Sequence, residues 1–290
     1  MRPNLQKSRV LTLLLLMTGL ATSGCASLMS NAASGMADSL SNGILNHDDP
    51  DTVREGIPSY MIMMDGFVHD NPDDPAMLGA AAYLYASFGA GFVDDPARAS
   101  RITARGRDYA LRAICIEYAA ACDWRELTYD EFVATLDGLG PEHADAVYTY
   151  SFATLAFLRA HSSDWNSLAE LPQSEALVKR YLEITGNNAE SSAHTYLGIL
   201  LTLRPPALGG KPEEARQHFE KAIAMSGGRD LSAKVEFAKG YAKLLYEQEL
   251  HDRLIGEVLE SDPNVEGMTL SNVLAQQEAL RLQAEAYDYF

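Results

Sequence analysis

Basic residues are scarce in this chain, which carries 23 Lys and Arg against 40 Asp and Glu in 290 residues, a net charge of −17 at pH 7. Such an excess of negative charge repels the phosphates of nucleic acids and the surface of anionic bilayers. The composition therefore argues against a nucleic-acid-binding protein and against membrane binding through surface charge.

Motifs for catalysis and for metal binding are also missing. The seven histidines are scattered, and none forms a His-Glu-x-x-His pair or lies at zinc-ligand spacing from a cysteine. The chain has no Gly-x-Ser-x-Gly elbow, and Gly209-Gly210-Lys211 lacks the rest of a phosphate-binding loop. We predict a protein that is not an enzyme and that needs no metal or cofactor. An active site assembled only by the fold is the alternative.

No segment alternates polar and apolar residues over a useful length, so we expect no β-sheet. Apolar residues instead recur at helical spacing, which predicts an all-α fold. Residues 76–93 carry no charged side chain, and their length alone would suit a membrane span. They are rich in Ala, Gly and Tyr and have acidic ends, which favours a helix sandwiched between neighbouring helices.

The start of the chain has the organisation of a cleaved leader. Three basic residues precede an apolar run from Val10 to Ala21, and small residues follow up to Gly24. The run is short for a bilayer span. Cys25 at the expected cut predicts a bacterial lipoprotein signal, with the Cys25 thiol as the site of lipid attachment. An ordinary signal peptide with an incidental cysteine is the alternative.

Three segments follow from this pattern. Residues 1–24 are the predicted signal peptide, and residues 48–290 are a predicted helical-repeat domain. Residues 25–47 are a tether rich in Ser, Ala, Asn and Gly, for which one short helix is the alternative. Because Ala26 follows the cysteine, we expect sorting to the outer rather than the inner membrane, as in lipoproteins generally. The protein is thus predicted to be lipid-anchored in the bacterial cell envelope, facing the periplasm.

The stretch from Ala193 to Gly228 organises the folded part. Its first half is so apolar that it predicts a helix buried nearly all round, ended by two prolines. Gly209 and Gly210 let the chain reverse, and Pro212 suits the first position of a second helix with one apolar stripe. We predict an antiparallel helical hairpin, with His218 on the surface of its second helix.

This hairpin matches the tetratricopeptide pattern in part. Leu197 and Gly198 in the first helix, and Ala215, Phe219 and Ala222 in the second, are of the expected types. Small residues let the two backbones approach closely, and Phe219 is expected to fill the gap between them. The segment between Gly198 and Ala215 is longer than usual, so an ordinary two-helix hairpin is the alternative.

Three Asp-Asp-Pro triplets, at residues 48–50, 73–75 and 94–96, predict helix starts. Aspartate is a preferred N-cap, and proline suits the first helical position. The same acidic residues do not form a calcium loop, which needs alternating oxygen ligands closed by a glutamate.

A second and weaker repeat is predicted after the second triplet. Leu78-Gly79 repeats the Leu-Gly pair of the later hairpin, and Ala99, Thr103 and Gly106 hold the small positions of its second helix. Degenerate repeats of this kind favour a stack of hairpins.

Further helices are predicted along the rest of the chain. They are expected at residues 129–136, 141–158, 172–185, 231–245, 254–259 and 270–287. In the segment 231–245, one stripe is apolar, and Lys234, Lys239 and Lys243 are expected outside it.

Cys115 and Cys122 are a candidate disulfide. On a continuous helix their Cα atoms would be roughly 10 Å apart, too far for a bond. If the helix ends near Ala119, the chain can fold back and join them, and an oxidising periplasm would favour the bond. The sequence leaves both arrangements open, and a bond here would staple the chain without redox chemistry.

Together these features resemble the TatT family, the tetratricopeptide-repeat lipoproteins associated with TRAP (tripartite ATP-independent periplasmic) transporters. The resemblance rests on the leader, the degenerate hairpins, the segments 94–99 and 107–113, and the Leu208-Gly209-Gly210 turn before residues 215–222. It covers nearly all of the mature chain. It implies an all-α fold, an α-α superhelix of degenerate tetratricopeptide-like hairpins.

The resemblance also implies a function. Such a protein would work beside the periplasmic solute-binding protein of a TRAP transporter, would bind or pass a small hydrophobic or organic-acid ligand, and could form a homotrimer. Tightly stacked helices rich in Ala, Gly and Tyr are compatible with an apolar space. The candidate lining residues are aromatic, with plain core packing as the alternative: Tyr83, Tyr85, Tyr148, Tyr150 and Phe152. The alternative function is a protein-interaction scaffold in the cell envelope without a small ligand.

Overall fold

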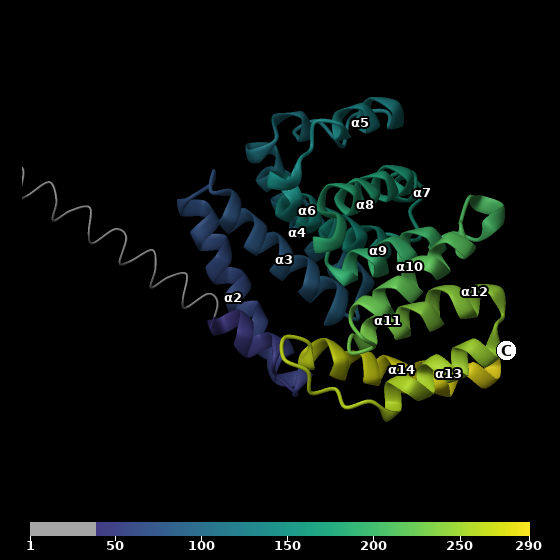
Figure 1. The fold of residues 1–290 in the computed structure, drawn as a ribbon. Helices are drawn as coiled ribbons and strands as arrows, with labels where there is room; N and C mark the ends of the chain where they lie inside the picture. The colour runs from purple at the N-terminus through teal and green to yellow at the C-terminus, as the bar shows by residue number, and fades with distance from the viewer. Residues whose placement is uncertain (1–38) are drawn as a thin grey trace, which may run out of the picture.

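The computed structural model describes residues 39–290, which are helical with short connections and contain no strand (Figure 1). The all-α prediction is therefore confirmed for this part of the chain. The predicted signal peptide at residues 1–24, the lipid-attachment residue Cys25 and the tether as far as residue 38 lie outside the described residues.

The helices, in chain order, are residues 39–45, α2 (Pro50–Asp70), α3 (Pro75–Gly91), α4 (Pro96–Glu117), α5 (Tyr129–Leu136), α6 (Ala144–Ala160), α7 (Trp165–Leu168), α8 (Leu171–Thr185), α9 (Ser191–Thr202), α10 (Pro212–Met225), α11 (Leu231–Glu236), α12 (Lys243–Leu245), α13 (Gln248–Glu260) and α14 (Thr269–Tyr289). Four short 3-10 turns join some of them: η1 (Ala119–Ala121), η2 (Pro141–His143), η3 (Gly186–Asn188) and η4 (Pro206–Leu208). Between α11 and α12 the helix passes through a π-helical segment, η5 (Phe237–Ala242).

Each Asp-Asp-Pro triplet begins a helix, as predicted. Asp49, Asp74 and Asp95 are the N-caps of α2, α3 and α4, and each side chain accepts a hydrogen bond from a backbone N–H in the first turn. The proline that follows each cap has no N–H to leave unpaired. The starts of these three helices therefore follow from local side-chain chemistry.

Helices α3 and α4 form the first close hairpin. Gly106 on α4 faces the α3 backbone, where an added Cβ would lie 2.9 Å from the Ala86 N and 3.1 Å from the Ala82 O. Helix α3 is also covered by α2 and α6, so the uncharged segment is sandwiched between helices as expected. None of the described helices combines the length and the apolar character that crossing a bilayer requires.

Helices α9 and α10 form the second close hairpin, which is the one that the sequence marked most clearly. An added Cβ at Gly198 would lie 2.8 Å from ring atoms of Phe219, which is fully buried. The reversal between the helices uses η4 and Gly209, whose φ of 90° is a left-handed conformation that favours glycine. Phe219 therefore fills the gap opposite a small residue, as predicted. The arrangement is compatible with a tetratricopeptide-like superhelix.

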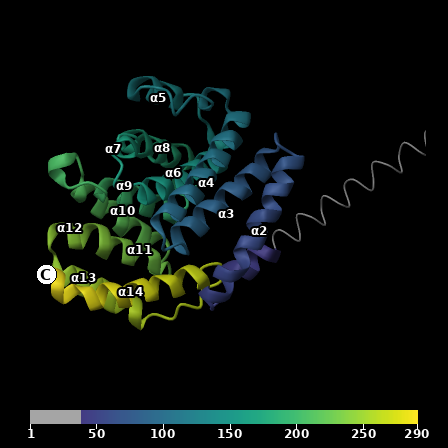
Figure 2. The ribbon, with the colours of Figure 1, turned by 180° about the vertical axis from the view of Figure 1, so that it is seen from behind.

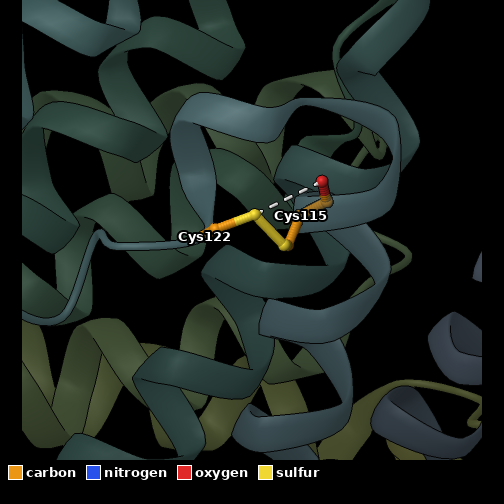
Figure 3. Close-up of a disulfide and its surroundings, with 2 residues drawn as sticks. All are labelled: Cys115 and Cys122. Atoms are coloured by element: carbon orange, nitrogen blue, oxygen red, sulfur yellow. Dashed lines mark hydrogen bonds between the residues drawn. A yellow bond between two sulfur atoms is a disulfide. The ribbon is translucent and has the colours of Figure 1, made fainter.

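Helix α4 ends at Glu117, and η1 turns the chain back toward it (Figure 3). The Cα atoms of Cys115 and Cys122 are 4.6 Å apart, and the two sulfur atoms are bonded. The dashed line in Figure 3 marks a 3.6 Å contact between Cys122 Sγ and the Cys115 carbonyl oxygen. Because a disulfide sulfur carries no proton, this contact is not a donated hydrogen bond.

The apolar interior has two parts. The first lies mainly among α2 to α6, and the second lies mainly among α8 to α14. Helices α6, α8, α9 and α14 contribute residues to both. The first described residues also contact the last helix, because the start of α14 lies beside residues 39–46, while the C-terminus lies at the other end of that helix (Figures 1 and 2). There the Gly267 N–H donates a hydrogen bond of 2.7 Å to Asn46 Oδ1. The fold is thus closed by contact between its first and last elements.

The prediction that Lys234 lies on the outer side of its helix is wrong. Its side chain is 11% exposed, and its ammonium lies 2.9 Å from the Glu257 carboxylate on α13. Helix α13 packs over α11 at this point, which a periodicity within α11 alone cannot reveal.

Candidate functional site

Three of the five aromatic residues predicted to line a ligand space lie together. Tyr83 of α3 contacts Phe152 of α6 with ring centroids 5.0 Å apart, and Phe152 stacks on Tyr196 of α9 at 5.4 Å. Tyr148 joins them, since its hydroxyl lies 3.0 Å from that of Tyr196 and 2.6 Å from Ser192 Oγ. We call Tyr83, Tyr148, Phe152 and Tyr196 the aromatic cluster.

The hydroxyls of the aromatic cluster are neutral at physiological pH. Burial raises the pKa of Tyr148 to about 12, and it also raises the pKa of Tyr196 well above the usual value for tyrosine. Tyr83 is 41% exposed, so the cluster reaches the surface at that ring. The cluster can therefore contact apolar or aromatic groups and can exchange hydrogen bonds, but it offers no charge.

The structure does not bring Tyr85 and Tyr150 to the aromatic cluster. The Tyr85 hydroxyl donates a hydrogen bond of 2.7 Å to Asp65 on α2, which the Tyr109 hydroxyl also contacts at 2.8 Å. Tyr150 packs on Trp124 with ring centroids 5.5 Å apart, beside an internal cavity of about 10 Å³. That cavity has room for about one water molecule. These two tyrosines belong to packed core contacts.

A pocket of about 290 Å³ lies elsewhere, where α6, α9 and α14 meet the continuous helix α11–η5–α12. Ile199, Leu203 and Leu244 supply its apolar wall, together with the ring of Tyr289. The π-helical segment borders it at Gly240, where an added Cβ would lie 2.8 Å from Thr202 Oγ1. The close approach of η5 to α9 therefore requires a residue without a side chain. Single-turn π-helical insertions are frequent at functional sites.

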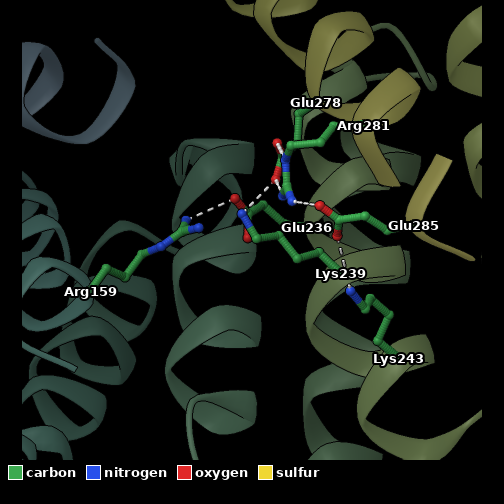
Figure 4. Close-up of polar contacts among 7 residues, drawn as sticks. All are labelled: Arg159, Glu236, Lys239, Lys243, Glu278, Arg281 and Glu285. Atoms are coloured by element: carbon green, nitrogen blue, oxygen red, sulfur yellow. Dashed lines mark hydrogen bonds and ion pairs between the residues drawn. The ribbon is translucent and has the colours of Figure 1, made fainter. Parts of the chain in front are cut away.

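Three cations line this pocket, and each has an acidic neighbour (Figure 4). The Arg159 guanidinium donates a hydrogen bond of 2.8 Å to Glu236, and the Lys239 ammonium donates one of 2.6 Å to Glu278. Lys243 lies 3.7 Å from Glu285, which is beyond hydrogen-bonding distance. Figure 4 shows that the partners of both lysines project from α14, so that helix contributes the acidic side of the site.

Glu278, the partner of Lys239, is firmly ionised. Burial alone would raise the pKa of Glu278, but the hydrogen bonds and charges of Arg281 and Lys239 lower it to about 2. The charge of Glu236, in turn, raises the pKa of Arg159. The pocket therefore keeps fixed charges of both signs over the physiological pH range.

Few features of the sequence indicated this pocket. Arg159 and Glu236 are 77 positions apart, and Lys239 and Lys243 were expected simply outside an apolar stripe. What could have pointed to the site is the pair of lysines four residues apart beside Gly240, in a chain with few basic residues. The pocket combines an apolar wall with charged groups, which suits the binding of an amphipathic molecule.

Two of the seven histidines also meet, which the sequence did not indicate. His194 Nδ1 of α9 and His218 Nδ1 of α10 are 2.8 Å apart, and their rings stack. Burial is the main cause that lowers the pKa of His194 to about 4, and burial also lowers the pKa of His218. A hydrogen bond between two ring nitrogens needs one donor and one acceptor, so the neutral pair links the two helices of the hairpin. His218 is thus half-buried rather than fully on the surface.

Comparison with known proteins agrees with this architecture. A search of curated proteins finds no match. A family model described as TAtT, TRAP transporter T-component, matches residues 46–290. The match includes both close hairpins, the aromatic cluster and the pocket, and it begins four residues before α2. The chain therefore belongs to the TAtT family, the T-component of TRAP transporters.

Proposed function

We propose that this protein is a non-enzymatic accessory component of a TRAP transport system that binds a small amphipathic organic acid. Membership of the family associates the chain with such a system. The observation that carries the proposal is the pocket, where an apolar wall faces three cationic side chains in a chain of net charge −17.

The size and the lining of the pocket support this ligand class. About 290 Å³ is near the lower end of the range for small-molecule sites. Contact with Ile199, Leu203 and Leu244 removes apolar ligand surface from water, at about 25 cal/mol per Å². The cations favour an acidic end group over a neutral one. A neutral lipid would leave Lys243, whose carboxylate neighbour Glu285 is 3.7 Å away, without an anion at hydrogen-bonding distance.

We further propose that the domain works in the periplasm as a lipoprotein anchored through Cys25, in the outer membrane rather than the inner one. The disulfide between Cys115 and Cys122 supports an oxidising compartment. The proposed partner is the periplasmic solute-binding protein of the same transport system, and a homotrimer is one proposed assembly. Replacement of Cys25 by serine is expected to release the protein from membranes, which fractionation would detect.

The ligand proposal is tested by mass spectrometry of small molecules extracted from protein that was purified under mild conditions. We expect an organic acid in the wild type and its loss in Leu244→Trp, which fills the pocket. Leu280→Trp is the matched control, because Leu280 is 57% exposed on α14 and does not line the pocket. Recovery of no small molecule, together with capture of the solute-binding protein, would instead favour a protein-interaction scaffold.

A further inference from the structure

The charged side chains that line the pocket are three cations and one carboxylate: Arg159, Lys239, Lys243 and Glu236. The seven residues in Figure 4 are four cations and three carboxylates: Arg159, Lys239, Lys243, Arg281, Glu236, Glu278 and Glu285. In a chain whose net charge is −17, this group is a local excess of positive charge. A partly buried group of this kind is most stable when its charges are balanced, so the excess of one cation favours the binding of an anion.

Lys243 is the cation whose carboxylate neighbour is most distant. The Arg159 and Lys239 pairs measure 2.8 Å and 2.6 Å, whereas Lys243 Nζ is 3.7 Å from Glu285. The Lys243 ammonium lies over the Tyr289 ring, 4.4 Å from its centroid, and its side chain is only 20% exposed. The Lys243 ammonium therefore faces a ring and a distant carboxylate. A charge-assisted hydrogen bond to a bound anion would stabilise it more than the contact with the ring does.

Glu285 is not free to move fully onto Lys243. Its carboxylate also accepts a hydrogen bond from Arg281, one turn earlier on α14. That contact holds Glu285 on its own helix and away from the pocket. Glu285 therefore competes weakly with an incoming anion for the positive charge of Lys243, while the tighter pairs of Arg159 and Lys239 stay closed.

The other side of the pocket is apolar and indicates the chemistry of the rest of the ligand. The aliphatic side chains of Ile199, Leu203 and Leu244 line it, and the Tyr289 ring lies beside Lys243. The Tyr289 hydroxyl donates a hydrogen bond of 3.0 Å to the Lys243 carbonyl, which keeps this ring in place. A ligand with one charged end and an apolar body matches both parts.

We infer that the pocket selects a singly charged carboxylate with an apolar chain, that Lys243 binds the carboxylate, and that Glu285 weakens this binding by competing for Lys243. This inference rests on the proposed function, because it assumes that the pocket is the ligand site. It adds which residue sets the charge selectivity and why a second acidic group on the ligand is unfavourable.

The test is isothermal titration calorimetry of the folded domain with four probes: hexanoate, octanoate, the neutral hexanamide and the doubly charged adipate. We expect the two monocarboxylates to bind at least tenfold more tightly than hexanamide or adipate. Lys243→Met should weaken octanoate binding about tenfold or more, because a charge-assisted hydrogen bond is lost. Glu285→Gln should strengthen it several-fold, since the competing charge is removed while the hydrogen bond from Arg281 is kept.

Lys221→Met is the matched control, because Lys221 is exposed on α10 and does not line the pocket. Its octanoate affinity should equal that of the wild type, and circular dichroism should show that all variants are folded at the temperature of the titration. Equal binding of hexanoate and hexanamide, tighter binding of adipate, or an unchanged affinity in Lys243→Met would overturn the inference alone. If neither monocarboxylate nor hexanamide binds to the wild type, the pocket is not the ligand site and the ligand proposal fails as well.

Discussion

The two close hairpins solve the same packing problem with opposite helices. In α3–α4 the small residue is Gly106 on the second helix, which lies against the α3 backbone. In α9–α10 it is Gly198 on the first helix, which lies against the ring of Phe219. Gly79, which looks like Gly198 in the sequence, has nothing within 4 Å of an added Cβ. Both hairpins therefore bring their helices close together, but the glycine that allows it lies on the second helix in one hairpin and on the first helix in the other.

The largest effect is expected from Phe219→Ala in the second hairpin. The ring is fully buried and stacks on Phe237 of η5 with centroids 5.2 Å apart. Its loss should lower the free energy of unfolding by about 3–5 kcal/mol, because the cavity between the two helices cannot close fully. Urea denaturation measures the change.

A double-mutant cycle sharpens this prediction. Gly198→Ala alone should destabilise, since its Cβ would meet the ring, but it should cost much less in the Phe219→Ala background. Additive effects would show that Gly198 and Phe219 do not depend on one another.

In the first hairpin, Gly106→Ala should cost about 2–3 kcal/mol. The added Cβ would meet backbone atoms of α3, which cannot rotate away as a side chain can. The same urea titration applies. Because the contact is with backbone, Phe219→Ala should leave this cost unchanged, and a smaller cost in that background would contradict the separation of the two hairpins.

The second hairpin should also weaken in acid where the first does not. The folded state lowers the pKa of His194 to about 4, so the unfolded chain, with a histidine pKa near 6.5, binds the proton more readily. The stabilisation is complete above about pH 6.5 and is lost as the pH falls toward 4. Solvent screening at this partly exposed pair limits the loss to about 1 kcal/mol.

Hydrogen exchange at pH 4.5 and pH 7 measures this effect separately in each hairpin. The charged groups near the pair are Lys221, Lys179, Glu214 and Glu175. Helices α3 and α4 contain no histidine and should keep their protection. His194→Gln should remove the pH dependence in α9 and α10, and an unchanged pH dependence in that variant would assign it to other groups.

The smallest effect has the opposite sign. Gly79→Ala should stabilise the protein by about 0.5–1 kcal/mol, because the new methyl group meets no neighbour and alanine favours a helix more than glycine does. Thermal unfolding would show a slightly higher melting temperature. A destabilised Gly79→Ala would mean that this glycine has a packing role like that of Gly198.

Features that depend on nearby residues could be predicted from the sequence. The Asp-Pro helix starts, the bounds of α5 and the packing of Phe219 against Gly198 all follow from local residue types. The five aromatic residues predicted to line a ligand space do not all lie together, for a reason that the sequence already contained. Residues two apart on a helix point to opposite sides, so Tyr83 and Tyr85 could not share a face, whereas Tyr148 and Phe152, four apart, do.

The pocket could not be predicted because it depends on a change of helical period. Segment η5 is π-helical, and its wider turns rotate Lys239 and Lys243 relative to the stripe expected for a continuous α-helix. Its acidic partners come from α14, about 40 positions later. A residue pattern within one segment cannot show both the rotation of these lysines and the packing of a distant helix against them.

The length of α14 sets the distance between the pocket and the first described residues of the domain. Helix α14 has 21 residues, which spans on the order of 30 Å, and it starts beside Asn46 and ends at the Tyr289 wall of the pocket. The helix therefore acts as a rigid spacer. A partner that exchanges ligand with the pocket must reach this outer end, at the opposite end of α14 from where the chain enters the fold.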